Sequence, residues 1–199
     1  MSDYTSRTDE ELALLYADGD NKAFDVLLQR TQHKLFSYIM FVVRDHDVAD
    51  DIFQETFVKA IVKLQQGKYV DSGKFIYWLT RIAHNVIMDW YRDQHVENVV
   101  EPTADNDLSN LRCVSVMDSY RENELVNEQV LRDVKRMVHL LPASQREVVY
   151  MRYYQQIPFK EIAELTGVSI NTALGRMHYA LLNMRRMARE NKIELALMD

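Results

Sequence analysis

The chain has 199 residues, a formal net charge of −6 and only 5 Gly and 3 Pro. Apolar residues make up 47% and charged residues 27%. This composition is sufficient to bury a core and excludes a chain that is disordered as a whole. The scarcity of Gly and Pro disfavours a β-sandwich or barrel, and a single cysteine, Cys113, excludes an internal disulfide or a multi-cysteine zinc site. The longest apolar run, 38–43, is far shorter than the ~20 residues that span a bilayer. With no evident signal peptide either, we expect a cytoplasmic chain without membrane insertion.

The first half of the chain predicts four helices. Thr8 and Glu11 form a capping box that opens a short helix, and Gly19 ends it. A loop over 67–73 precedes the fourth helix, because glycine stands at both of its ends. Apolar residues at helical spacing predict the other three helices over about 21–43, 47–64 and 74–94.

The helical pattern breaks over 96–121, where Pro102 stands among clustered Asp, Asn and Ser. We interpret this segment as a flexible linker. Charge changes along the chain as well: residues 1–95 carry a net −4, residues 96–130 a net −6 and residues 131–199 a net +4. The basic last third is compatible with phosphate binding, although a solvated helix face has the same composition.

Helical spacing resumes after the linker. Ser144 and Glu147 form a second predicted capping box, Gly167 lies in a turn, and Ser169 is placed to cap the last helix. The predicted helices run from about 125 to before Pro142, then over about 144–154, 159–165 and 169–194. The predicted fold is therefore all-α, with small helical domains over 1–95 and 122–199 joined by a flexible acidic linker over 96–121.

The segment from Pro158 to Arg186 has the spacing of a helix-turn-helix, with Gly167 in the left-handed turn. Its second helix is expected to pack through Ile170, Ala173, Leu174 and Met177. Arg176 could reach a guanine or a phosphate, and Asn171 an adenine or a phosphate. The alternative is a plain helical hairpin whose cations complement the helix dipole. The candidate DNA-binding residues of this segment are Ser169, Asn171, Thr172, Gly175, Arg176, His178 and Arg185.

Acidic residues cluster near the start of the third helix, largely on one polar face. Such a face could receive an arginine-rich partner, although acids near a helix N-terminus are also ordinary complements of the dipole. A dimetal site is a weaker option because no Glu-x-x-His pair is present. The face consists of Asp47, Asp50, Asp51, Gln54 and Glu55.

The fourth helix combines cations with aromatic residues opposite its apolar stripe. Bases can stack on the rings while the cations hold phosphates, which suits single-stranded nucleic acid. The rings could equally belong to the core of a helical bundle. The face consists of Lys74, Tyr77, Trp78, Arg81, Asn85, Met88, Asp89 and Arg92.

Taken together, these residues resemble the extracytoplasmic-function (ECF) subfamily of the bacterial sigma-70 family of RNA polymerase sigma factors. The resemblance runs from about Asp9 to Arg189, apart from the linker. The order and spacing of its motifs make it specific. The motifs are AF at 23–24, ADDIFQETF at 49–57, WLTRIAHNVIMDWYR at 78–92, LPASQREVVYMRY at 141–153 and the helix-turn-helix.

The resemblance implies a promoter-specificity subunit whose partners are the RNA polymerase core, through its β′ clamp helices and β flap, promoter DNA and an anti-sigma factor. It implies no cofactor, no metal and no small-molecule substrate. The implied site for the core polymerase comprises Asp47, Asp50, Asp51, Ile52, Gln54, Glu55 and Phe57. The implied −10 site comprises Lys74, Tyr77, Trp78, Arg81, Asn85, Asp89 and Arg92, with Asn85 and the preceding loop contacting bases and Arg81 and Arg92 the backbone. The helix-turn-helix residues are implied to read the −35 element, and the acidic linker to thread toward the RNA exit channel.

The recognition helix departs from the family pattern between Thr172 and Arg176, where Ala-Leu-Gly replaces the usual intervening residues. This departure leaves the −35 sequence open. The alternative function is a helix-turn-helix repressor or activator with a helical effector domain. Catalysis is not expected, because the five glycines form no phosphate loop and the six histidines have no metal-binding spacing.

Overall fold

The structure is a computed structural model that describes residues 4–69, 74–96 and 127–190. These residues form helices and connecting turns, with no strand among them. The chain falls into two compact units whose main boundary lies between Val100 and Glu101. The predicted all-α fold is confirmed for the described part of the chain. The predicted linker lies outside the described residues except for Val96, and the predicted domain limits stay predictions.

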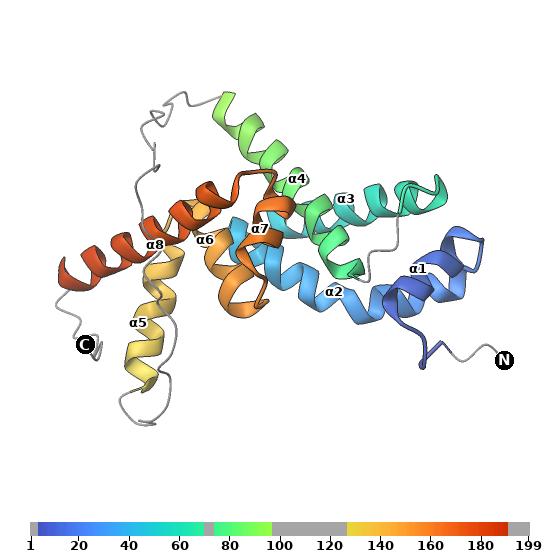
Figure 1. Cartoon of the computed structure of the whole chain (residues 1–199), viewed down its shortest axis with the longest axis horizontal. Helices are drawn as coiled ribbons and strands as arrows, with labels where there is room; N and C mark the ends of the chain where they lie inside the picture. Colours follow the sequence, from blue (N-terminus) through green and yellow to red (C-terminus); the bar gives the residue numbers. More distant parts are fainter. Residues whose placement is uncertain (1–3, 70–73, 97–126, 191–199) are drawn as a thin grey trace. The chain divides into compact units, whose positions relative to one another are not determined.

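The first unit contains α1 (Asp9–Ala17), α2 (Asn21–Val43), α3 (His46–Gln65) and α4 (Phe75–Val96). In Figure 1, α2 is the long blue helix, and it packs against α1, α3 and α4. The helix limits match the sequence predictions to within two residues, because the apolar stripes are regular. Their buried residues include Leu12, Leu27, Leu35, Tyr38, Ile39, Leu64, Leu79 and Ile87.

Local signals fix the helix ends in this unit. The predicted capping box is confirmed: the Glu11 N–H donates to Thr8 Oγ1 at 3.2 Å, and the Thr8 N–H donates to Glu11 Oε2 at 3.1 Å. Gly19 follows α1 with φ of 103°, a conformation that glycine adopts at little cost. Asp45 caps α3 by accepting hydrogen bonds from the N–H groups of Asp47 and Val48.

Hydrogen bonds and an ion pair attach the N-terminal segment of the first unit to α2. The Arg30 guanidinium donates to the carbonyl oxygens of Tyr4, Thr5 and Arg7 and pairs with Asp9 Oδ1 at 3.1 Å. The Tyr4 hydroxyl adds a 2.8 Å hydrogen bond to Asp20. The segment before α1 is therefore attached to the bundle through several charge-assisted bonds.

The remaining elements are α5 (Asn127–His139), α6 (Ala143–Val149), the π-helical turn η1 (Tyr150–Tyr154), α7 (Phe159–Thr166) and α8 (Ile170–Glu190). They belong to the second unit, apart from the end of α7 from Glu164 on. Helices α5 and α6 pack against α8 and against each other. Apolar residues from these helices and their connections form its core, namely Met137, Leu141, Val148, Met151, Ile157, Ile162, Ala173 and Ala180.

Two sequence predictions fail in the second unit. Helix α6 begins after Pro142 without a side-chain cap, and Glu147 is fully buried, so the second capping box is wrong. The S-x-x-E spacing is compatible with a helix interior as well as with a cap, so it does not fix the start. Ile170, predicted to pack inward, is 46% exposed at the first position of α8.

The predicted helix through Tyr154 changes to a π-helical turn at Tyr150. The rings of Tyr150 and Tyr154 stack there with centroids 5.2 Å apart. Burial, with a smaller contribution from the charge of Tyr154, raises the pKa of Tyr150. The turn ends at Tyr154, and two residues later Gln156 has a φ of 55°, which is unusual for a residue other than glycine. Helical propensity gives no signal for such a turn.

Candidate nucleic-acid and protein interfaces

The acidic face of α3 is largely exposed, as the sequence predicted. Asp47, Asp51, Gln54 and Glu55 are exposed, and the side chain of Asp50 is 49% exposed. Two ion pairs lie along this face: His46 Nδ1 is 3.2 Å from Asp50 Oδ2, and Lys59 Nζ is 2.7 Å from Glu55 Oε1. The His46 pair carries charge on both sides only when the imidazole is protonated. The face therefore offers carboxylates to a basic partner surface.

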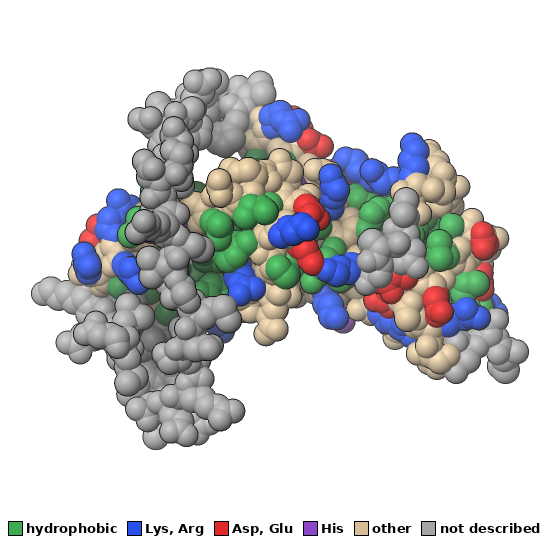
Figure 2. Space-filling model, in the orientation of Figure 1, with side chains coloured by type: hydrophobic (Ala, Val, Ile, Leu, Met, Phe, Trp, Pro, Cys, Tyr) green, Lys and Arg blue, Asp and Glu red, His purple; other side chains and the backbone are tan. Residues whose placement is uncertain are grey.

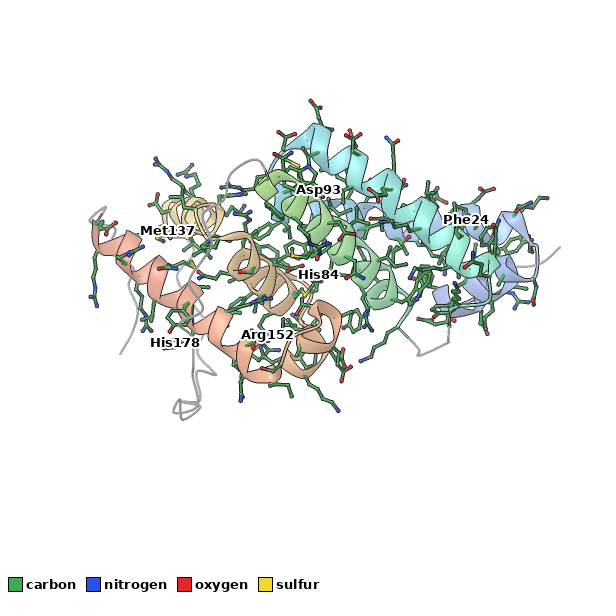
Figure 3. The ribbon with its side chains drawn as sticks, turned by 90° about the horizontal axis from the view of Figure 1, so that it is seen from above. Phe24, His84, Asp93, Met137, Arg152 and His178 are labelled. Atoms are coloured by element: carbon green, nitrogen blue, oxygen red, sulfur yellow. The ribbon has the colours of Figure 1, made fainter. Side chains whose placement is uncertain are left out.

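Two further residues of the implied core-polymerase site, Ile52 and Phe57, lie in the core of the first unit, as their place in the apolar pattern of α3 predicts. Ile52 is 3% exposed and Phe57 is 8% exposed. The Phe57 ring packs on Phe53 at 4.9 Å and on Phe24 at 6.3 Å between centroids; Phe24 is labelled on α2 in Figure 3. Both residues hold α3 against the rest of the bundle from its inner side. They are neighbours of the acidic residues in sequence, but they point to the other side of the helix.

Two exposed valines continue the acidic face and were missed at the sequence level. Val58 is 59% exposed and Val62 is 44% exposed. With Asp51 and Glu55 they follow the spacing i, i+4, i+7 and i+11, which keeps all four on one side of a helix. Both valines lie off the buried stripe of α3, so their spacing from Asp51 and Glu55 was the signal in the sequence that could have indicated them.

The cationic face of α4 lies opposite its buried stripe. Lys74, Arg81, Asn85, Asp89 and Arg92 are exposed, whereas His84, labelled in Figure 3, is buried on the other side of the helix. Arg92 Nη1 pairs with Asp89 Oδ1 at 3.1 Å, so part of its charge is compensated. A polyanion would therefore meet Lys74 and Arg81 toward the start of the helix and a neutralised pair near its end.

Aromatic residues gather at the N-terminal end of the same face. The Lys74 ammonium lies 5.1 Å from the centroid of the Tyr77 ring. Trp78 is partly exposed and packs on Tyr69 and Phe75 with centroids 5.1 and 5.5 Å apart. Residues 70–73 of the predicted loop lie outside the described residues. The partly exposed rings of Tyr77 and Trp78, beside two cations, form a surface on which an unpaired base can stack.

The helix-turn-helix is present as predicted. Gly167 has φ of 67° in the turn between α7 and α8. Ser169 caps α8: its Oγ accepts from the Thr172 N–H at 3.0 Å and lies 2.8 Å from the Thr172 hydroxyl. The geometry at the start of α8 is thereby fixed, since a polar side chain satisfies one of the free N–H groups.

The side chains of α8 divide into an outer and an inner set. Asn171, Thr172 and His178 are exposed, and Arg176 is partly exposed. Gly175 is buried, so this candidate faces the core rather than a ligand. Figure 3 labels His178 on this helix, and Figure 2 shows blue Lys and Arg side chains along the outer part of α8. The exposed arginines there include Arg185, Arg186 and Arg189.

Other chemistries find no support among the described residues. No group of three or more His, Cys, Asp or Glu that could hold a metal ion occurs in that part of the chain. Cys113 lies outside it. No helix of the described ranges is long and apolar enough to cross a membrane.

Two segments of the chain match known protein families. Residues 27–96 match the family described as Sigma-70 region 2, and residues 131–184 match Sigma-70, region 4. The first match contains α3 and α4 and most of α2, and the second contains α6, α7 and most of α5 and α8. Each of the three candidate surfaces therefore lies in a matched segment, except that Arg185 of α8 follows directly after the second match.

Curated relatives and solved structures extend the similarity to nearly the whole chain. The ECF RNA polymerase sigma-E factor of Haemophilus influenzae is 29% identical over 193 residues, covering 94% of this chain and 96% of the relative. That of Escherichia coli K12 is also 29% identical, over 192 residues, with 94% and 95% coverage. The sigma factor RpoE of Bartonella quintana, solved with the anti-sigma factor NepR, is 22% identical with a TM-score of 0.60, covering 87% of this chain and 99% of that one. CnrH, solved with the cytosolic domain of CnrY, is 23% identical with the same TM-score and coverages of 92% and 97%.

Proposed function

Because the chain belongs to the ECF group of the sigma-70 family and functions as a sigma factor of RNA polymerase, we propose that three helix faces divide the work of promoter recognition. The α3 face docks on the core enzyme, the α4 face captures the −10 element, and the start of α8 reads the −35 element. The relatives are sigma factors, and this chain matches almost their whole length. A sigma factor is therefore favoured over the alternative of a repressor or activator with an effector domain.

The docking surface on α3 has an acidic part and an apolar part. Asp51 and Glu55 attract basic side chains of the β′ clamp helices, and Val58 and Val62 bury apolar area next to them. Charge complementarity accelerates encounter, while burial of the valines slows dissociation. Ile52 and Phe57 hold α3 in the bundle from its inner side. The β flap of the core polymerase is the expected second contact, and it binds the second unit.

The α4 surface holds separated strands. Arg81 contacts backbone phosphates, and Arg92 does so once Asp89 releases it. Asn85 contacts a base, and Tyr77 and Trp78 stack with unpaired bases. Each captured base offsets the few kcal/mol that unpairing and unstacking cost, so binding free energy opens the duplex. No catalytic chemistry of the chain's own is required, and we propose that it has none.

The start of α8 enters the major groove of the −35 element. The exposed side chains of Asn171, Thr172 and Arg176 reach base edges or phosphates there, with Ser169 holding the first turn. Gly175 faces the core and carries no contact with DNA in this proposal. Arg185 lies more than two turns further along and contacts phosphates.

The partners follow from this assignment. The chain works with the polymerase in the cytoplasm, and an anti-sigma factor controls it by covering one or more of the three faces. Two structurally similar sigma factors were solved with regulatory partners, namely NepR and the cytosolic domain of CnrY, which supports a partner of this kind.

One observation carries the proposal: two separately matched segments each present an exposed cationic helix face, on α4 and on α8. Two such faces, each weak alone, bind DNA tightly only when a third body fixes their spacing. The test is binding of labelled promoter duplex with and without core polymerase. We expect weak binding by the free chain and tight, promoter-specific binding by the complex. Tight binding by the free chain, unchanged by core enzyme, would refute the proposal.

A further inference from the structure

A carboxylate of α1 reaches the first residue of α4. Glu10 Oε1 accepts a 2.8 Å hydrogen bond from the Phe75 backbone N–H, although the two residues are 65 positions apart. The neighbouring acids have other partners: Asp9 pairs with Arg30 at 3.1 Å, and Glu11 completes the capping box with Thr8. Three consecutive carboxylates therefore make three separate connections, and only that of Glu10 reaches α4.

This hydrogen bond supplies what the local sequence of α4 lacks. Helices begin with free N–H groups that a Ser, Thr, Asp or Asn side chain usually satisfies. The residue before α4 is Lys74, whose ammonium can only donate hydrogen bonds and so cannot accept one from a free N–H. Its carbonyl oxygen accepts from the N–H groups of Tyr77 and Trp78. The Glu10 carboxylate satisfies the Phe75 N–H and complements the positive end of the helix dipole. The same bond is the main reason why the pKa of Glu10 is lowered, so the group stays ionised.

Phe75 connects this anchor to the aromatic end of the α4 surface. Its side chain is 2% exposed, and its ring lies against Trp78 at 5.5 Å and against Tyr69 at 5.6 Å between centroids. Lys74 and Tyr77 lie in the same first turn, joined by their cation–π contact. Glu10 therefore holds the turn from which the proposed base-capturing side chains project.

We propose that Glu10 is a positioning residue for promoter opening, acting through the Phe75 N–H to fix the first turn of α4. The proposal rests on the function assigned to the α4 surface. Glu10 itself is not required to touch DNA. Fixing this turn in advance lowers the conformational cost of stacking an unpaired base on Trp78 or Tyr77.

The test compares substitutions at Glu10 with matched substitutions at Glu11. Glu10→Ala removes the acceptor, Glu10→Gln keeps an acceptor oxygen without the charge, and Glu10→Asp shortens the side chain by one methylene. Glu11→Ala and Glu11→Gln change the same type of residue one position away and affect only the local cap of α1. Each full-length variant is assembled with core polymerase on a promoter that the wild-type complex binds, at a temperature where all variants are folded. Core affinity and the permanganate reactivity of unpaired thymines are both measured.

We expect Glu10→Ala to lower the equilibrium ratio of open to closed complexes about ten-fold, the size expected for one charge-assisted hydrogen bond. Core affinity is expected to stay unchanged. Compared with Glu10→Ala, Glu10→Gln is expected to recover part of the promoter opening and Glu10→Asp little of it. Both Glu11 variants are expected to open the promoter as the wild type does. If Glu10→Ala opens the promoter as the wild type does, or if the Glu10 and Glu11 variants lose opening equally, the inference about Glu10 is overturned but the function assigned to α4 is not. If the wild-type complex melts no promoter, the function assigned to α4 fails as well.

Discussion

The Arg146 guanidinium donates a 2.7 Å hydrogen bond to the carbonyl oxygen of Leu141, and a 3.2 Å bond from the same nitrogen reaches the carbonyl oxygen of His139. Arg146 is 2% exposed, so these carbonyls at the C-terminal end of α5 are satisfied inside the second unit. A buried arginine thus closes the turn between α5 and α6, where a glycine or water often takes this part.

Arg146→Met should therefore destabilise the chain. The substitution keeps much of the volume but removes the donor from the buried carbonyl oxygen of Leu141 and the part-buried one of His139. Loss of a hydrogen bond to a charged group costs about 1.5–3 kcal/mol. Urea titration of the full-length chain measures the change in the free energy of unfolding. Lys135→Met, at an exposed position of α5, should stay within about 0.5 kcal/mol of wild type. Equal effects of the two substitutions would contradict this role for Arg146.

The bond between Glu10 and Phe75 also predicts a pH dependence. The pKa of Glu10 is lowered from its ordinary value of 4.5 in the folded chain. Its contribution to stability is therefore fully present above about pH 4.5 and is lost as the pH falls through the lower, folded value. Thermal unfolding between neutral pH and pH 3 should show a shallower acid loss for Glu10→Gln than for wild type. Parallel curves would argue against the bond.

Reversal of charge on α3 should abolish docking. In Asp51→Arg with Glu55→Arg, two carboxylates that face a basic partner become like charges, and the Lys59 pair is lost as well. Affinity for core polymerase, measured by fluorescence anisotropy, should fall at least a hundred-fold, about 2.7 kcal/mol. Asp18→Arg with Asp25→Arg makes the same charge change at exposed positions of the first unit outside α3. Equal loss in this control would show a general effect of charge rather than a docking face.

Arg176→Ala should weaken −35 recognition while leaving core affinity intact. Loss of one good contact between an arginine and a base typically costs about 1–3 kcal/mol, so promoter-specific transcription should fall roughly ten-fold or more. Arg186→Ala removes an arginine from the same helix, where it lies 3.9 Å from Glu190, and should have a smaller effect. A parallel loss of core affinity in Arg176→Ala would remove Arg176 from the DNA-reading set.

Asn85→Ala should impair promoter opening more than initial promoter binding, because the exposed amide is assigned to an unpaired base. The measurement compares the heparin-resistant fraction of complexes with the total bound fraction. Gln94→Ala serves as the control, since an exposed residue nine positions along α4 lies on the opposite side of the helix. If Asn85→Ala lowers both fractions equally, the base contact is refuted.

The sequence predicted the helices of the first unit well because strong local signals agree there. The stripe of α2 and the Thr8–Glu11 cap both depend on residues within one or two turns of each other. The failures have different causes. Ser144 and Glu147 match a cap motif but lie within α6, and Gly175 and Ile170 lie in a stretch of small and mixed residues where the inner face of the helix is weakly marked.

The candidate surfaces on α3 and α4 were predicted by residue type and spacing, whereas the inner and outer sides of α8 were predicted only in part. Helical periodicity separates the buried Ile52 and Phe57 from the outward-facing acids of the same motif, but the resemblance assigns both groups to one binding site. The connection from Glu10 to Phe75 spans 65 residues, so no local pattern could indicate it. The π-helical turn at Tyr150 likewise has no signature in helical periodicity.

The central claim is that this chain directs core polymerase to a defined set of promoters. Transcription by purified core polymerase on a randomised promoter library, with and without the chain and with start sites read by sequencing, tests it most directly. We predict that the chain produces new start sites sharing two separated sequence elements upstream, and that the Asp51→Arg with Glu55→Arg variant produces none. Start sites that are identical with and without the chain would contradict the account.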